Sequence, residues 1–379
     1  MEQTMVVGLI PAPELPADIA VQLAEELSQA FSDYIMDAGD WSIRLYHDPL
    51  TGAAENIDQN MRRAAAIKKK EGWDYTVCLT DLPMFSHKDV VLGDVNEDTG
   101  VAQVSIPAFG FFPLRKRVKK AIIQMVSELY YKVNGYPESA DEGAAASNEG
   151  HLLKRRFYFS PIRKTTHPTE REKSDVLFVL RPRFYGRTRL LLGMAYANKP
   201  WSIVPAFKSV VAVAFATGAY GLIFPTLWKL SVAYGSIRFV ALMLAAIFGM
   251  VIWVIFAHNL WEKPSYKSER KLRILYNAAT VMTLGVAVMV QYGVLYILFL
   301  TAVAFFVPPD LYASVTGLEG KVGFRHYMQL AWLVTSVATV AGAIGSSLED
   351  DSMVRNITYG YRQQQRYKRM EYYGDDIGD

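Results

Sequence analysis

The stretch 100-GVAQVSIPAFG-110, followed by 114-LRKRVKKAIIQMVSELYYK-132, decides the fold of the first part of the chain. Apolar residues dominate the first segment up to Pro107, which predicts a strand that ends in a turn. In the second segment apolar residues recur every three or four positions, which predicts an amphipathic helix that packs on the strand. No pair of metal ligands lies on this helix. A layered α/β domain is therefore expected.

The residues on either side extend this pattern. Strands are predicted in MVVGLI (5–10), WSIRLYHDP (41–49), YTVCLTDLP (75–83) and VVLGDV (90–95), and helices over 17–36 and 55–70. The order β-α-β-α-β-β-β-α predicts a mixed sheet covered by helices. We expect a cytosolic α/β head over residues 1–137, followed by an acidic, flexible linker over 138–150. The start of the chain has no basic region before an apolar core, so no cleavable signal is predicted.

Residues 151–206 mix short aromatic runs with many basic residues and are predicted to be a juxtamembrane segment. A hairpin of RFYFSP (156–161) and VLFVLRP (176–182) is expected there, followed by an amphipathic helix over 188–197. The arginines that stand before the first apolar block are Arg181, Arg183, Arg187 and Arg189. We expect them to contact phosphates of anionic inner-leaflet lipids. A specific pocket for an anionic ligand is the alternative.

Four apolar blocks predict an all-α four-helix transmembrane bundle over residues 207–347, with a basic cytosolic tail over 348–379. The predicted spans are 209–228, 239–259, 275–307 and 327–346. The third block is too long for one straight span and too short for two. The basic loop 262–273 and the basic segment 361–369 both favour the cytosolic side, so one crossing is preferred. The result is a multi-pass protein of the cell membrane with both termini cytoplasmic; a third block that crosses twice would put the tail outside.

A cluster of acidic residues in the head raises the question of a metal site. Its members, with one histidine, are Asp81, His87, Asp89, Asp94, Glu97 and Asp98. The chain has no HExxH motif, and DVNEDTG (94–100) lacks the last glutamate of a calcium loop, so a hairpin turn is favoured over a metal site. GxGxxG, a Walker lysine and a serine elbow are also missing from the sequence, so no cofactor is predicted. Asp81, Asp89 and Asp94 remain candidates for binding or coupling.

Two features mark the end of the last span. Ala338, Gly342 and Ser346 lie four residues apart, which allows close packing within the bundle or between two copies in a homo-oligomer. Glu349, Asp350 and Asp351 lie at the helix C-terminus, where acidic groups oppose the helix dipole. These three are expected to pair with the basic loop 262–273 and to couple the head to the bundle. A solvated junction is the alternative.

Composition excludes some classes of function. The net charge is only +3, which gives no reason to expect nucleic-acid binding. The single cysteine, Cys78, excludes an internal disulfide, and its strand pattern predicts a small buried residue.

Two resemblances to known families accompany these predictions. CLTDLP (78–83) and VAQVSIPAFG (101–110) resemble the head of archaemetzincin-type zinc peptidases, over about residues 4–133. That family carries HExxH on the next helix, where this chain has KKAIIQMVSELYY (119–131). The resemblance therefore implies a metal-free relative, with no catalytic residue carried over.

The second resemblance covers about residues 186–366. GRTRLLLGMAYANKPW (186–201), FAHNLWE (256–262) and YMQLAWLVTSVATVAGAIGSSLEDDSMVR (327–355) resemble a family of Gram-positive bacterial membrane proteins. Members commonly carry the label 5,10-methylene-tetrahydrofolate dehydrogenase. The resemblance implies a cytosolic α/β head and a membrane bundle, without a settled activity. The dinucleotide fold and catalytic lysine that the label would require are not seen in the sequence.

These observations favour a non-enzymatic membrane protein with a cytosolic binding or regulatory head. Its expected partners are the lipid bilayer and a cytosolic protein. The alternative is an enzyme of the head, either a metal-dependent hydrolase or a folate-related oxidoreductase. A passive channel is the least favoured class, because the predicted spans contain few polar residues.

Overall fold

The computed structural model describes residues 4–35, 39–48, 57–86, 88–134, 162–167, 175–202, 207–262 and 270–345, together with Arg355 and Tyr361. The chain forms two compact units: a head that ends at Ala197, and a helical unit that begins at Asn198. The predicted linker over 138–150, and most of the predicted tail, lie outside the described residues.

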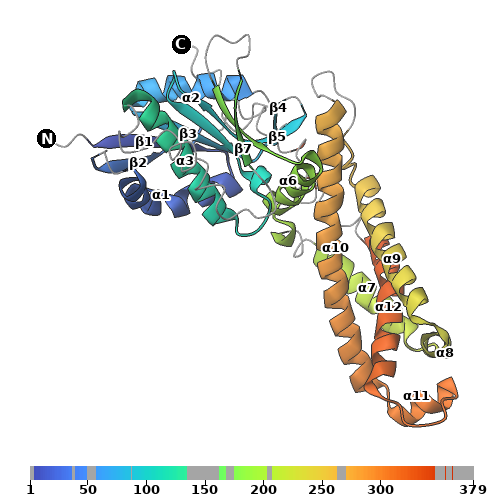
Figure 1. Ribbon diagram of the computed structural model, residues 1–379. Helices are drawn as coiled ribbons and strands as arrows, with labels where there is room; N and C mark the ends of the chain where they lie inside the picture. The colour runs from blue at the N-terminus through green and yellow to red at the C-terminus, as the bar shows by residue number, and fades with distance from the viewer. Residues whose placement is uncertain are drawn as a thin grey trace, which may run out of the picture. The chain divides into compact units, whose positions relative to one another are not determined.

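The head contains an eight-stranded mixed sheet and its flanking helices (Figure 1). In chain order its elements are β1 (Met5–Pro11), α1 (Leu15–Tyr34), β2 (Trp41–Leu45), α2 (Ile57–Glu71), β3 (Tyr75–Thr80), β4 (Met84–Ser86), β5 (Asp89–Asn96), β6 (Val101–Ser105), the 3-10 helix η1 (Ile106–Phe109), α3 (Leu114–Asn134), β7 (Ile162–His167), β8 (Asp175–Leu180) and α6 (Arg183–Ala197). The predicted mixed sheet with helices packed on it is therefore confirmed.

The strand order is β2-β1-β3-β6-β5-β8-β7, with β4 paired to β5. Neighbours among the first four strands pair in parallel, whereas β5, β8 and β7 pair with their neighbours antiparallel. Every residue of β3 and β6 is buried. This burial on both faces explains why neither strand contains a charged residue.

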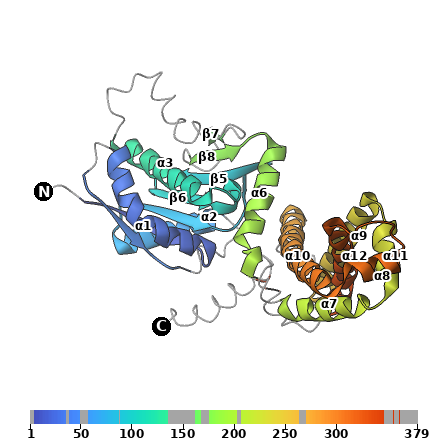
Figure 2. The ribbon, with the colours of Figure 1, turned by 90° about the horizontal axis from the view of Figure 1, so that it is seen from below.

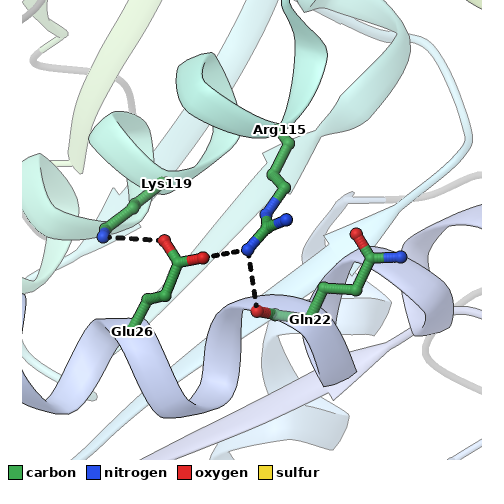
Figure 3. A network of polar contacts seen from close by, with 4 residues as sticks. All are labelled: Gln22, Glu26, Arg115 and Lys119. Atoms are coloured by element: carbon green, nitrogen blue, oxygen red, sulfur yellow. Dashed lines mark hydrogen bonds and ion pairs between the residues drawn. The ribbon is translucent and has the colours of Figure 1, made fainter.

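Helices cover both faces of the parallel strands. Helices α1 and α3 lie on one face and α2 on the other (Figure 1). An added Cβ at Gly93 would stand 1.7 Å from Cε of Met125 in α3, so the close approach of α3 requires glycine there. Arg115 and Lys119 of α3 both pair with Glu26 of α1, which ties the two helices together (Figure 3).

The segment predicted to be juxtamembrane instead belongs to the head, up to Ala197. Strand β8 pairs with β5, and Phe178 and Leu180 of β8 are buried. The predicted second strand of the hairpin is therefore present, and β7, which begins at Ile162, pairs with it. The segment predicted for the first strand, 156–161, lies outside the described residues. The sequence interpretation failed here because the basic residues of β7 belong to an exposed sheet edge, where charges discourage pairing between molecules. Helix α6 then lies beside β5 and β8 (Figure 2).

The helical unit consists of the 3-10 helix η2 (Pro200–Ser202), α7 (Lys208–Gly221), α8 (Pro225–Ala233), α9 (Ser236–Ala257), α10 (Arg270–Phe306), α11 (Pro309–Thr316) and α12 (Phe324–Gly345). Among the described residues, three helical segments are long and apolar enough to cross a membrane: Ser236–Ala257, Lys271–Phe306 and Phe324–Ile344.

Two predictions about the spans can be compared directly with the helices. The first predicted span, 209–228, is not one straight helix, because α7 and α8 meet at a bend of 91°. Pro225 explains the break, since proline has no N–H and is favoured at the first position of a new helix. The third block forms one continuous helix of 37 residues, about 55 Å long, so a turn within it is excluded.

The small residues of α12 pack against α7 of the same chain. A Cβ added at Gly342 would stand 2.8 Å from Cβ of Ala214 and 3.2 Å from the carbonyl oxygen of Val210. Ala338 lies 3.0 Å from a Cβ added at Gly218. The close packing predicted for this stripe therefore occurs within the bundle, while Ser346 lies outside the described residues.

The extended head generates a folding prediction. A chain that ends at residue 137 lacks β7, β8 and α6 and exposes the apolar edge of β5, whereas a chain that ends at Ala197 keeps the complete sheet. We expect the longer chain to be monomeric and to melt cooperatively by circular dichroism, and the shorter one to aggregate. A cooperative, monomeric 1–137 chain of equal stability would contradict this assignment.

The α7–α12 contact generates a second prediction. Gly342→Leu should destabilise the detergent-solubilised protein by about 1–3 kcal/mol, because overpacking forces the two helices apart. Gly249→Leu is the matched control, since a Cβ at this exposed position of α9 meets no atom within 4 Å. Thermal unfolding followed by tryptophan fluorescence measures both. Equal melting temperatures for Gly342→Leu and Gly249→Leu would contradict the close contact between α7 and α12.

Candidate functional site

The candidate site lies at the edge of the sheet where the parallel strands end. From β1 the chain first moves to β2 on one side and later to β3 on the other, so the connections reverse direction between β1 and β3. In open α/β sheets, ligands bind outside the carboxyl ends of strands at such a reversal. We call this edge the carboxyl edge of the head.

Two acidic residues follow neighbouring strands at the carboxyl edge. Asp81 comes directly after β3 and is only 1% exposed. Glu14 comes after β1 with φ of +70°, a backbone conformation that is unfavourable for a residue other than glycine. Strained backbone of this kind is often found at functional sites. Asp81 was a sequence candidate, whereas Glu14 was missed, because backbone strain leaves no signal in a sequence.

The antiparallel strands bring three further candidates to the same edge. Leu180 at the end of β8 pairs with Val90 near the start of β5. Asp89 therefore receives two arginines: Nη2 of Arg181 lies 3.1 Å from Oδ2 and Nε of Arg183 lies 2.6 Å from Oδ1. The hydrogen bond from Arg183, helped by that from Arg181, lowers the pKa of the largely buried Asp89 carboxyl. Two arginines predicted to contact lipid phosphates thus hold a carboxylate of the head.

A second group of arginines lies beside η1, at the end of β6. Helix α6 packs closely on this turn, since a Cβ at Gly193 would stand 2.0 Å from the carbonyl oxygen of Pro107. Nη1 of Arg117, in the first turns of α3, donates a hydrogen bond of 2.7 Å to the carbonyl oxygen of Phe109. Arg189 of α6 is only 7% exposed, and its Cγ lies 3.2 Å from a Cβ added at Gly110.

The two guanidinium groups influence each other electrostatically. Burial, and then the neighbouring charge of Arg117, lower the pKa of Arg189 to about 10. Burial also lowers the pKa of Arg117. The turn at η1 is therefore a region of concentrated positive charge, partly removed from water. Arg189 was a sequence candidate, whereas Arg117 was missed, because a basic residue in LRKRVKK is typical of a solvated helix face.

Bulky exposed side chains adjoin these arginines. On α6, Phe184 is 81% exposed and Tyr185 is 41% exposed. Phe111 and Phe112 are also exposed, and they directly follow the turn that contacts α6. Exposed aromatic residues that accompany basic ones are typical of surfaces that contact membrane interfaces or other proteins.

The remaining candidates do not join this group. Asp94 lies five positions along β5 from Asp89, about 16 Å away, and pairs in register with Gln103 inside the sheet. Glu97 forms an ion pair of 2.8 Å with Lys132. Arg187 is exposed on α6. His87, Glu349, Asp350 and Asp351 lie outside the described residues. Within the described ranges, no three His, Cys, Asp or Glu side chains lie close enough together to hold a metal ion.

The Asp89 contacts generate a stability prediction. Asp89→Asn removes the charge but keeps the shape, so the free energy of unfolding of the head should fall by about 1–2 kcal/mol at pH 7. Asp33→Asn, at an exposed position of α1, is the control. The pKa of Asp89 is lower in the folded head than in the unfolded chain, so this stabilisation is present above about pH 4 and is lost as the pH falls further. Denaturant unfolding at several pH values measures it. If the difference in free energy of unfolding between Asp89→Asn and Asp33→Asn did not become smaller at acidic pH, the ion pairs of Asp89 would be contradicted.

Comparisons of the chain with known protein families, with curated proteins and with solved structures found no match. The two family resemblances drawn from short sequence phrases therefore stay predictions. The site has to be interpreted from its own chemistry, which is that of buried and half-buried arginines beside a turn at the carboxyl edge.

Proposed function

We propose that this chain is an integral membrane protein with a non-enzymatic, cytosolic binding or regulatory head, and that the head binds an anionic ligand at the η1 turn. The observation that carries this proposal is the convergence of Arg117 and Arg189 at that turn. A guanidinium group offers five N–H donors in a planar fork that matches phosphate and carboxylate groups.

The electrostatics of the two arginines supports an anionic ligand. Burial, and after it the charge of Arg117, disfavour the charged form of Arg189 in the folded head, and the pKa of Arg189 is lowered accordingly. An anion held beside both groups offsets the repulsion between them, and the partial burial of the turn strengthens the attraction. The position agrees with the general location of ligands outside the carboxyl ends of the strands. A ligand at this turn contacts α3, α6 and η1 together, so its binding can change the packing of α6 on η1.

Helix α6 also supplies a surface for the inner leaflet. Arg187, Phe184 and Tyr185 are exposed on this helix. Arginine attracts anionic lipid phosphates, and aromatic rings favour the membrane interface. Because Arg181 and Arg183 hold Asp89, Arg187 takes the lipid-contacting role that the sequence suggested for the whole group. A cytosolic protein or a second copy of the chain would compete for the same aromatic surface.

For the helical unit we propose four crossings, with both termini in the cytosol. Phe207, before α7, lies in one apolar cluster with Leu284 and Ala343, whereas Trp228 of α8 lies in another with Val303. This arrangement supports α7 as a short first crossing, with α8 lying along the far surface. Nε of Arg355 donates a hydrogen bond of 3.3 Å to the carbonyl oxygen of His258 at the end of α9. A basic residue of the tail therefore lies at this end of α9, and the preference of basic residues for the cytosolic side supports a cytosolic location for that end.

The same architecture is what the resemblance to the Gram-positive membrane protein family implies, and we propose membership on that basis. A second candidate function is an enzyme of the head, either a metal-dependent hydrolase or a folate-related oxidoreductase. The buried Asp81 and the strained Glu14 at the reversal between β1 and β3 favour it. The two functions differ in the residues that they need: the anion site depends on Arg117 and Arg189, whereas an enzyme would depend on Asp81.

The anion site is tested with inorganic pyrophosphate as the probe and the full-length protein in lipid nanodiscs. We expect saturable binding by calorimetry, with an affinity at least tenfold lower for Arg117→Gln, because a charge-assisted hydrogen bond contributes about 1.5–3 kcal/mol. Arg189→Gln should have a similar effect if the variant keeps its melting temperature.

Arg62→Gln, at an exposed position of α2, is the matched control and should bind as the wild type does. If Arg62→Gln and Arg117→Gln bound pyrophosphate with equal affinity, the loss of affinity would reflect the overall surface charge. That result would contradict a specific site at the η1 turn. Binding that is lost in Asp81→Asn but kept in Arg117→Gln would favour the enzyme instead.

A further inference from the structure

A groove on the helical unit is not used by the proposed function of the head. Its volume is about 730 Å³, within the usual range for ligand sites. The described residues that line it are Trp261, Arg273, Ile274, Asn277, Ala278, Val281, Met282, Gly285, Val286 and Met289. All except Trp261 belong to α10, so the groove follows one face of this helix.

The two ends of the groove differ in chemistry. Its polar residues, Trp261, Arg273 and Asn277, lie together at the start of the apolar part of α10. Oδ1 of Asn277 accepts a hydrogen bond of 2.9 Å from the backbone N–H of Glu262, which fixes the orientation of the amide. From Ala278 onward the lining is entirely apolar.

The floor of the apolar part is low at Gly285, which has no side chain. A Cβ added at Gly285 would meet no atom within 4 Å, so the space above this glycine is open. The flanking Val281 and Met289 are exposed and form raised borders. The groove is therefore a depression in an otherwise apolar surface, and a flexible chain could lie in it.

The dimensions match one lipid of one leaflet. From Arg273 to Met289 the helix rises over 16 positions, about 24 Å. Half of the hydrocarbon core measures about 15 Å, and one headgroup layer adds about 5–7 Å. A lipid whose headgroup lies at Arg273 thus extends its acyl chain along the groove to about the middle of the bilayer.

We infer that this groove binds one anionic glycerophospholipid, with its phosphate at Arg273 and Trp261 and one acyl chain over Gly285. The charge of Arg273 and the interfacial preference of tryptophan select the headgroup end. A helix from a second copy of the chain fits less well, because its apolar surface would cover a charged guanidinium group. The inference rests on the proposed membrane location of the helical unit, but not on the ligand of the head.

Native mass spectrometry of the detergent-solubilised protein tests the inference, with dioleoyl-phosphatidylglycerol and dioleoyl-phosphatidylcholine as the probes. We expect one phosphatidylglycerol molecule to be retained at concentrations where phosphatidylcholine is not. Arg273→Gln should weaken binding of phosphatidylglycerol about fivefold and leave phosphatidylcholine unchanged. Gly285→Leu should weaken binding of both lipids, because its side chain fills the floor of the groove.

Matched controls are Arg325→Gln at the start of α12 and Gly249→Leu on α9, both at exposed positions. These should retain phosphatidylglycerol as the wild type does. Equal retention of the two lipids by the wild type, or equal effects of Arg325→Gln and Arg273→Gln, would overturn the inference. A dimer that binds no lipid and dissociates in Gly285→Leu would assign the groove to a second copy. Extraction of the protein from membranes by alkaline carbonate would instead refute the membrane location, which is a separate outcome.

Discussion

The antiparallel pairing of β5 with β6 is the constraint on which the head depends. Strands β2, β1, β3 and β6 run in parallel, and their carboxyl ends meet at one edge. Strand β5 is antiparallel to β6, and β8 is antiparallel to β5. The start of β5 and the end of β8 therefore both lie at that edge. Asp89, Arg181 and Arg183 thereby meet, and α6 begins where it can pack on the η1 turn. The arginine pair at η1 follows from this return of the chain.

In the helical unit the governing constraint is the backbone. Peptide groups inside a bilayer must pair within a helix, so a break is tolerated only where protein or water satisfies the freed groups. The break before Pro225 is followed by α8, whose Trp228 stacks on Tyr312 of α11 and donates a hydrogen bond from Nε1 to the carbonyl oxygen of Leu222. Side chains at one end of the bundle thus support the bend, while α9, α10 and α12 remain continuous.

Periodicity was sufficient to predict the main elements of the head and the three long apolar helices, because each signal is local. It failed where the fold depends on distant partners. The basic residues of β7 gave no sign that this segment completes the sheet of the head. Asp89 and its arginines were all identified from the sequence, but their pairing depends on strand register and could not be predicted. Of the two arginines at η1, only Arg189 was identified from the sequence. Their proximity could not be predicted, because Arg117 and Arg189 lie 72 positions apart in the chain.

We propose that the head and the loop between α11 and α12 lie on opposite sides of the membrane. Labelling of single introduced cysteines in intact cells with a membrane-impermeant maleimide tests it most directly. Cys78 gives little background, because burial raises the pKa of its thiol to about 12. We predict that Lys321→Cys, at an exposed position of that loop, is labelled in intact cells, and that Arg62→Cys in the head is labelled only after permeabilisation. Labelling of Arg62→Cys from outside would contradict the account.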